Sequence, residues 1–234
     1  MSPSCPFCKI AAAHPPVPPT KYLPAPETTS TTEAAKSPSS TPTTAPSPGE
    51  EGHAFLILST NHVLAFLDIM PLTQGHVLVI PRTHHEKLGE VGVRVSRELG
   101  TWIPILSRAV MRTVFGESTD SDNQIDGNGS TSTLTDPSWH WNVVQNNGVG
   151  AAQVVPHVHF HIVPRPPLGA ASTGAKMSFI MFGRGSREDL DEEEAEKLVG
   201  ALRESVAREV VRVKEVEGVD LEGEFGGGGE KGRL

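Results

Sequence analysis

The sequence predicts an α+β domain built on a five-stranded antiparallel sheet with a central helix. Two patterns predict it: short apolar runs bounded by turn residues, and one long stretch whose apolar residues recur three or four positions apart. The first three runs follow one another closely, which favours an antiparallel meander. The expected strands are residues 54–58, 63–67, 76–80, 139–145 and 155–163.

The helical pattern covers residues 90–115 and is interrupted by Gly100 and Pro104. A proline inside a helix removes one backbone donor and clashes with the preceding turn, so we expect a kink or two separate helices. A second helical pattern lies near the C-terminal end of the chain, with Asp189 and Glu192 placed as a capping box.

Composition divides the 234 residues into ordered and disordered segments. Stretches rich in Pro, Ser and Thr, or in Gly, cannot bury enough apolar surface to offset the entropy lost on ordering. We therefore expect an N-terminal turn with two cysteines at 1–14, a disordered insert at 15–52, the main folded domain at 53–187 with a flexible loop at 116–137, an acidic C-terminal helix at 188–217 and a disordered Gly-rich tail at 218–234.

The charge balance disfavours some partners. Asp and Glu number 28 against 20 Lys and Arg, the formal net charge is -8, and no long basic run is present. Nucleic acid and an anionic membrane are therefore not expected partners. Without a membrane-spanning apolar run or a signal-peptide pattern, we expect a soluble protein of the cytoplasm, with the nucleus as a second location.

Two groups of residues carry candidate chemistry. Cys5 and Cys8 form a C-x-x-C pair, which is typical of a metal half-site or a redox pair. His157, His159 and His161 occupy alternate positions, so an extended strand would turn all three imidazoles to one face.

The three histidines could form a metal cluster or surround a catalytic histidine. No Asp or Glu occurs from Gln145 through Arg165, which counts against a hydrolytic metal centre on this strand. A histidine nucleophile attacking phosphorus needs a neighbouring proton donor and amides for the charged oxygens. The small-residue loop 146–152 offers such amides, so the sequence favours the nucleophile.

The segment from His157 to Pro164, H-V-H-F-H-I-V-P, resembles the signature of the histidine triad family of nucleotide hydrolases and transferases, in its Hint-like branch. Further segments match that family in the same order: A-F-L-D-I-M-P at 65–71, T-Q-G-H-V-L-V-I-P at 73–81, and N-N-G at 146–148 followed by Gln153. The ordered set is more specific than the triad alone. The resemblance implies the fold of that family and makes residues 53–187 the catalytic domain.

The resemblance also implies roles for individual residues. His159 matches the family's nucleophile, His161 the histidine that contacts phosphate, and His157 a supporting histidine. Asp68 matches the carboxylate that holds the ribose hydroxyls; taken alone it would equally suit a turn at a strand end. Phe66 matches a residue that lines the base and ribose pocket. The residues that match positions near the phosphate are His76, Asn146 and Gln153.

Some members of the family with a C-x-x-C pair bind one zinc ion. The resemblance then implies a closed, structural Cys₂His₂ site made of Cys5, Cys8, His84 and His157, with His85 as a rival to His84. The alternative is a pair of free thiols without metal. No catalytic cofactor is implied.

The activity implied is hydrolysis of a purine nucleoside 5'-phosphoramidate through a covalent nucleotidyl-histidine, in a homodimer whose sheets join. Two alternatives stay open: cleavage of dinucleoside polyphosphates, and a nucleotide-binding scaffold or regulatory protein that acts through its acidic helix and inserts. Val154 departs from the family pattern, because many members carry a serine there whose hydroxyl could aid protonation of the leaving group. The leaving group therefore does not follow from the resemblance.

Overall fold

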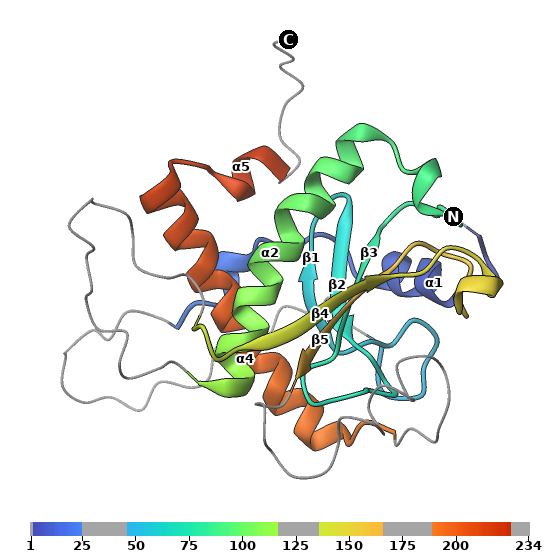
Figure 1. The fold of residues 1–234 in the computed structure, drawn as a ribbon, viewed down its shortest axis with the longest axis horizontal. Helices are drawn as coiled ribbons and strands as arrows, with labels where there is room; N and C mark the ends of the chain where they lie inside the picture. Colours follow the sequence, from blue (N-terminus) through green and yellow to red (C-terminus); the bar gives the residue numbers. More distant parts are fainter. Residues whose placement is uncertain (1, 25–45, 117–135, 166–188, 226–234) are drawn as a thin grey trace.

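The computed structural model describes residues 2–24, 46–116, 136–165 and 189–225, and confirms the expected α+β class (Figure 1). A five-stranded antiparallel sheet has the order β1-β2-β3-β5-β4. None of the helices in these ranges is long and apolar enough to span a bilayer. The elements are α1 (Pro6–Ala13), the 3₁₀ helix η1 (Pro19–Tyr22), β1 (Leu56–Ser59), β2 (Val63–Leu67), β3 (Val77–Pro81), the 3₁₀ helix η2 (Leu88–Glu90), α2 (Val93–Phe115), β4 (His140–Gln145), the 3₁₀ helix η4 (Val149–Ala151), β5 (Phe160–Arg165), α4 (Glu192–Arg212), the π-helical turn η5 (Val213–Glu217) and α5 (Leu221–Phe225).

The two faces of the sheet are covered by different layers. Figure 1 shows α2 and α4 on one side of the sheet and the short α1 on the other. Along β2, Val63, Ala65 and Leu67 pack into the larger core with α2 and α4, while Leu64 and Phe66 pack against α1. This alternation follows from the two-residue period of a strand, and it explains why every residue of β2 is buried. The side covered by α1 is the side that carries the histidines.

The turn into β3 requires a glycine. Gly75 has a φ of +78°, and a Cβ at this position would lie 2.5 Å from Cγ2 of Val114 on α2. A side chain here would therefore meet both backbone strain and a clash. Gly75 lets the chain pass close under α2 and places His76 at the start of β3.

The histidine segment differs from the predicted strand. β5 begins at Phe160, so only His161 lies within it, whereas His157 and His159 precede it. The expectation of a strand from residue 155 is wrong because the chain there bonds elsewhere: the amide of Val158 donates to the carbonyl of His85 at 2.7 Å, beyond the end of β3. The three rings therefore do not form one regular row.

Two helix expectations are also corrected. The possibility of two helices across Pro104 is wrong: α2 is a single helix in which Pro104 is exposed, so water can satisfy the carbonyl that lacks a partner. The capping residue of α4 is Asp191 and not Asp189. Its side chain accepts from the amide of Glu194 at 2.9 Å, three residues along as N-cap geometry requires.

The disorder expected from residue 15 is wrong for residues 15–24, because neighbouring elements hold them. Val17 forms a bridge to Ser59 at the outer edge of β1, and Thr20 donates to the carboxylate of Glu222. The tail expected to be disordered from residue 218 begins with α5, whose Leu221 is buried in the larger core. Residues 46–52 of the expected insert are also described, with Glu50 donating its amide to the carbonyl of Ser47. Residues 25–45 of the insert, 117–135 of the expected loop, 166–188 and 226–234 lie outside the described residues.

A buried ionic cluster joins α4 to α2. Glu209 on α4 is 1% exposed and accepts hydrogen bonds from Arg108 and Arg112 of α2 and from Arg212 of its own helix. Burial alone would raise the pKa of the Glu209 carboxyl, but the bonds from Arg112 and Arg108 outweigh burial, and the pKa lies below its ordinary value of 4.5. The ionised carboxylate is therefore the form that holds the two helices together.

We predict that Glu209→Gln lowers the free energy of unfolding at pH 7 by about 1–3 kcal/mol, because charge-assisted hydrogen bonds are lost. The folded-state pKa lies below the unfolded value, so this contribution is complete above about pH 4.5 and is lost as the pH falls through the folded-state pKa. Urea unfolding at pH 7 and in acid measures both effects. The control Glu204→Gln, in an exposed pair with Arg208, should cost less than about 1 kcal/mol. Equal losses for the two variants at pH 7 would contradict the prediction.

Candidate functional site

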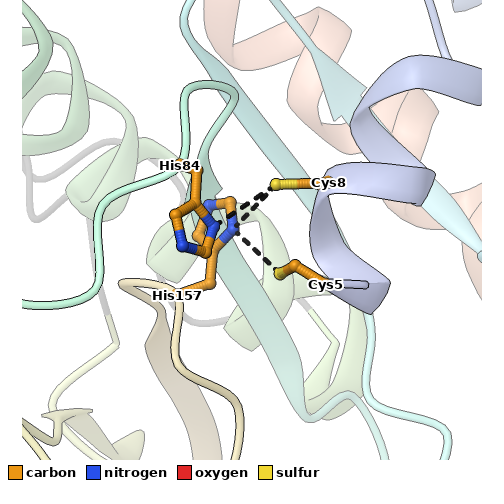
Figure 2. A group of neighbouring side chains, drawn as sticks. All are labelled: Cys5, Cys8, His84 and His157. Carbon is orange, nitrogen blue, oxygen red and sulfur yellow. Dashed lines mark hydrogen bonds between the residues drawn. The ribbon is translucent and has the colours of Figure 1, made fainter. Parts of the chain in front are cut away.

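Four side chains from three parts of the chain converge beneath α1 (Figure 2). Cys5 and Cys8 come from the start of α1, His84 follows β3 and His157 precedes β5. Sγ of Cys5 lies 3.5 Å from Nδ1 of His157, and Sγ of Cys8 lies 3.4 Å from Nδ1 of His84. All the ligand atoms lie within 4.8 Å of one another, as bonds of about 2.0–2.3 Å to one tetrahedral ion require. The Cys₂His₂ set can therefore hold one metal ion, with His84 and not His85 as the member.

Local structure explains why the cysteines reach this position. Residues i and i+3 of a helix share one face, so a C-x-x-C pair at the start of α1 turns both thiols the same way. The other end of α1 is tied to the sheet by Arg82, whose guanidinium donates to the carbonyls of Ala11 and His14 and to Oγ of Ser59. Both cysteines are buried.

His157 is prepared as a ligand by its second nitrogen. Its Nε2–H donates to the carbonyl of Pro81 at 2.9 Å, so Nδ1 carries the lone pair that faces the two sulfurs. Burial lowers the pKa of His157 to about 4, which keeps the ring neutral. A neutral imidazole whose other nitrogen donates to a carbonyl is the form that binds metal.

His159 has the opposite arrangement of its ring nitrogens. Its Nδ1 donates to the carbonyl of His157 at 2.7 Å, so the lone pair lies on Nε2. Burial also lowers the pKa of His159. A neutral ring with a bare Nε2 can act as a nucleophile, and the carbonyl at Nδ1 can stabilise the positive charge that attack would create.

A chain of hydrogen bonds orients His161. The amide of Leu72 donates to Nδ1 of His76 at 3.2 Å, so the proton of His76 lies on Nε2, which donates to Nδ1 of His161 at 2.9 Å. His161 then carries its own proton on Nε2. The ring centroids of His161 and His159 are 4.9 Å apart. A nitrogen lone pair and an N–H donor are thus placed on adjacent rings.

Asp68 stands where β2 ends and closes the loop before β3. Its backbone amide donates to the carbonyl of His76, and its Oδ1 accepts from the amide of Met70 at 2.9 Å. Its Oδ2 lies 3.4 Å from Nδ1 of His76, so the carboxylate faces the same chain of histidines. Asp68, His76 and His161 also form a group whose ligand atoms lie within 4.8 Å, but both nitrogens of His76 already take part in the hydrogen-bonded chain.

The loop expected to hold phosphate is organised by Gln153. Its Oε1 accepts from the amide of Gly148 at 2.5 Å, and its Nε2 donates to the carbonyl of Glu86 at 2.8 Å. Asn147, and not Asn146, ties the loop to the segment after β3, since its Oδ1 accepts from the amide of Leu88.

The expectation of an amide-rich loop open to an anion holds only in part. The amides that already donate within the loop are those of Gly148, Ala151, Ala152 and Gln153. Val154 follows this loop with 90% of its surface exposed, so the position where a serine hydroxyl would assist a leaving group presents an apolar side chain.

Sequence reasoning missed Phe7, which lies between the two cysteines. Its ring centroid lies 5.4 Å from that of His159, 5.8 Å from that of His157 and 5.6 Å from that of Phe66, each in an edge-on arrangement. An aromatic residue inside a C-x-x-C pair was the available signal, because its place on α1 is tied to that of the two cysteines.

Comparison with known proteins places the chain in a family. The HIT domain model matches residues 50–168, which is half of the chain. The chain therefore belongs to the HIT family of nucleotide hydrolases and transferases, as the order of its motifs predicts.

Individual relatives are similar over shorter stretches. An uncharacterized HIT-like protein of Saccharolobus solfataricus is 42% identical over 60 residues, covering 26% of this chain and 43% of the relative. Adenosine 5'-monophosphoramidase HNT1 of Candida albicans is 30% identical over 102 residues, covering 44% and 55%. The chain thus spans about half the length of these relatives.

Among solved structures, a zinc-bound histidine triad family protein from Mycobacterium smegmatis is 28% identical, with a TM-score of 0.44, covering 68% of this chain and 87% of that one.

Proposed function

We propose that this protein hydrolyses purine nucleoside 5'-phosphoramidates through a covalent nucleotidyl-His159 intermediate. The observation that carries the proposal is the complementary protonation of two adjacent rings. Nε2 of His159 has the lone pair, and Nε2 of His161 has the proton. Membership of a nucleotide-hydrolase family supports the same reaction, and so does the similarity to an adenosine 5'-monophosphoramidase.

In the proposed first step, Nε2 of His159 attacks the phosphorus. The new N–P bond forms as the bond to the amine breaks, and the amine leaves with a proton that His161 donates. Positive charge on the His159 ring is held by the hydrogen bond from Nδ1 to the carbonyl of His157. Water then attacks the phosphorus and gives a proton back to His161, and the N–P bond to His159 breaks to release the nucleoside monophosphate.

The remaining residues bind and orient the nucleotide in this proposal. Asp68 accepts the ribose hydroxyls, for which a carboxylate has the lone pairs, and Phe66 lies beneath the base and ribose. His76 sets the tautomer of His161, and the proton on its Nε2 passes to Nδ1 of His161 when His161 gives its own proton to the amine. The carboxylate of Asp68, whose Oδ2 lies 3.4 Å from Nδ1 of His76, favours the protonated His76 ring that can give this proton.

One observation favours dinucleoside polyphosphates as a second substrate class. Val154 offers no hydroxyl to a leaving group, and it is almost fully exposed. A phosphate leaving group already departs as an anion and depends less on a proton donor than an amine does. We keep a nucleotide-binding role without turnover as the alternative of another class.

We predict that incubation with adenosine 5'-phosphoramidate adds a nucleotidyl group to His159, and that His159→Ala abolishes both adduct and turnover. Mass spectrometry of the intact and digested protein measures the adduct. His161→Gln should slow its formation by about 10²–10⁴-fold, the usual contribution of a positioned proton donor. His140→Gln, on exposed β4, is the matched control and should change neither rate. Turnover that survives in His159→Ala would exclude the covalent route.

We also propose that Cys5, Cys8, His84 and His157 hold one structural zinc ion. Two sulfurs and two imidazole nitrogens suit zinc, and a closed set of four ligands, of which only His84 is partly exposed, leaves no position for substrate. When bound, the ion supplies a crosslink between α1 and the two segments that flank the site, and it does not contact the reacting atoms.

We predict one zinc ion per chain by elemental analysis of the purified protein, with loss of metal and of stability in Cys8→Ala. His85→Ala is the matched control, because His85 adjoins His84 but lies outside the cluster. Its zinc content should equal that of the unmodified chain. Equal zinc content in Cys8→Ala and His85→Ala would refute the site.

We propose that the protein is a homodimer joined through β4. The outer edge of β1 is covered, since Val17 donates to the carbonyl of Ser59 and Arg203 donates to that of Leu56. β4 pairs with β5 on one side, and its Val143 is 44% exposed. In the part of the chain that the structure describes, β4 is thus the edge suited to pair with a second copy.

Light scattering should report a mass twice that of the 25.0 kDa chain, and Val143→Lys should shift the equilibrium toward monomer. Like charges that meet across an antiparallel strand pair destabilise it. Val93→Lys, at an exposed valine of α2, is the control and should leave the dimer intact. A monomer mass for the unmodified chain would overturn this proposal.

A further inference from the structure

Phe7 connects the Cys₂His₂ cluster to the proposed nucleophile. It lies on α1 between Cys5 and Cys8, so its position follows that of the two thiols. Its ring meets His159 at a centroid distance of 5.4 Å and an interplanar angle of 78°. Edge-on contacts of this kind restrict the rotation of both rings.

The two ends of α1 are held by different means. At the C-terminal end, Arg82 donates to the carbonyls of Ala11 and His14. At the N-terminal end no side chain caps the helix, and the N-cap residue is Cys5 itself. A helix of 8 residues does not maintain itself without outside contacts, so the N-terminal turn depends on the apolar packing of Phe7 and on the cluster that holds its cysteines.

Besides Phe7 and the ring of His161, the nucleophile is held by a hydrogen bond to a member of the cluster. Nδ1 of His159 donates to the carbonyl of His157, whose own ring faces Cys5 and Cys8. The tautomer of His159 is thus set by a residue of the cluster, and Phe7 is one of the two rings that orient it. His161, in contrast, is oriented through His76 on β3.

We propose that Phe7 is a positioning residue that makes the reactivity of His159 depend on whether a metal ion occupies the Cys5–Cys8–His84–His157 cluster. The bound ion holds the N-terminal turn of α1, and Phe7 then holds the His159 ring with Nε2 directed at the phosphorus. Loss of the ion frees that turn, and the ring of His159 gains rotational freedom. This inference rests on the proposed function and adds a dependence of its rate on the metal.

The test compares the unmodified chain with Phe7→Ala, each loaded with zinc and each stripped by a chelator. The measured quantity is the rate of adduct formation on His159 with saturating adenosine 5'-phosphoramidate. Stripping should slow the unmodified chain about tenfold, and Phe7→Ala should slow the loaded chain by a similar factor, because small misplacement of a reacting group has effects of this size. Stripping Phe7→Ala should then add less than about threefold, since coupled residues are not additive.

Two variants separate positioning from general loss of packing. Phe7→Leu retains bulk and should recover part of the rate of the loaded chain. Ile10→Ala removes a buried side chain from the same helix and the same core cluster, and should leave the rate and its dependence on zinc unchanged. If stripping and Phe7→Ala slow adduct formation by independent factors that multiply, the proposal is overturned. The same holds if Ile10→Ala slows adduct formation as much as Phe7→Ala does. If Phe7→Ala fails to fold, the comparison of Phe7→Leu with the unmodified chain decides the same question.

A second readout does not depend on turnover. Long-range ¹H–¹⁵N spectra of the imidazole rings report the tautomer and the order of His159 in loaded and stripped protein. The coupling is supported by His159 signals that are sharp in the loaded chain, broaden on stripping and are already broad in loaded Phe7→Ala. If these changes are seen but no adduct forms, the proposed reaction fails and the coupling stands. His159 signals indifferent to both changes overturn the coupling even where an adduct forms.

Discussion

The candidate metal site and the candidate nucleophile both depend on His157, whose Nε2 donates a hydrogen bond to the carbonyl of Pro81. Because Nε2 donates, Nδ1 must carry the lone pair, and it faces the sulfurs of Cys5 and Cys8. The carbonyl of the same residue accepts from Nδ1 of His159 and so leaves the lone pair of that ring on Nε2. A ligand nitrogen and a candidate nucleophile thus depend on one buried residue, His157, which precedes β5.

Burial maintains these states. His157 and His159 are almost fully buried, and burial lowers the pKa of both rings, as far as about 4 for His157. Both rings are therefore neutral near pH 7, which is the form that ligates metal or attacks phosphorus. Two neutral imidazoles can stand two residues apart without the repulsion that two charged rings would suffer.

The sheet carries the candidate site on one face, and other elements cover its second face and one of its edges. One face carries the histidines, Phe66 and α1, and the other is covered by α2 and α4, which Glu209 joins. The N-terminal segment around Val17 and Arg203 of α4 cover the edge at β1, which leaves β4 at the opposite edge. Segments outside the family's usual domain therefore cover one edge of the sheet and contribute side chains to the larger core. The candidate site lies between α1, the loop at 146–153 and β5.

Much of this could be predicted from the sequence. The strand-length apolar runs indicated the five-stranded sheet, because a two-residue period and turn residues are local properties of the chain. The motif order indicated the family, and the resemblance to that family indicated the four candidate metal ligands, with His85 as a rival to His84. Three features could not be predicted, because each depends on a part of the molecule distant in sequence. The start of β5 depends on the carbonyl of His85, and the capping residue of α4 depends on where that helix docks. The ordered structure of residues 15–24 depends on the edge of β1.

The sequence by itself determined which side chains are available for chemistry and on which elements they lie. Only the tertiary structure decided what each can do, because the protonated nitrogen of an imidazole is set by its hydrogen-bond partner, and those partners are the carbonyls of Pro81 and His157 and the ring of His76. Phe7 gained its importance in the same way. The packing of α1 against the sheet brings its ring to His159.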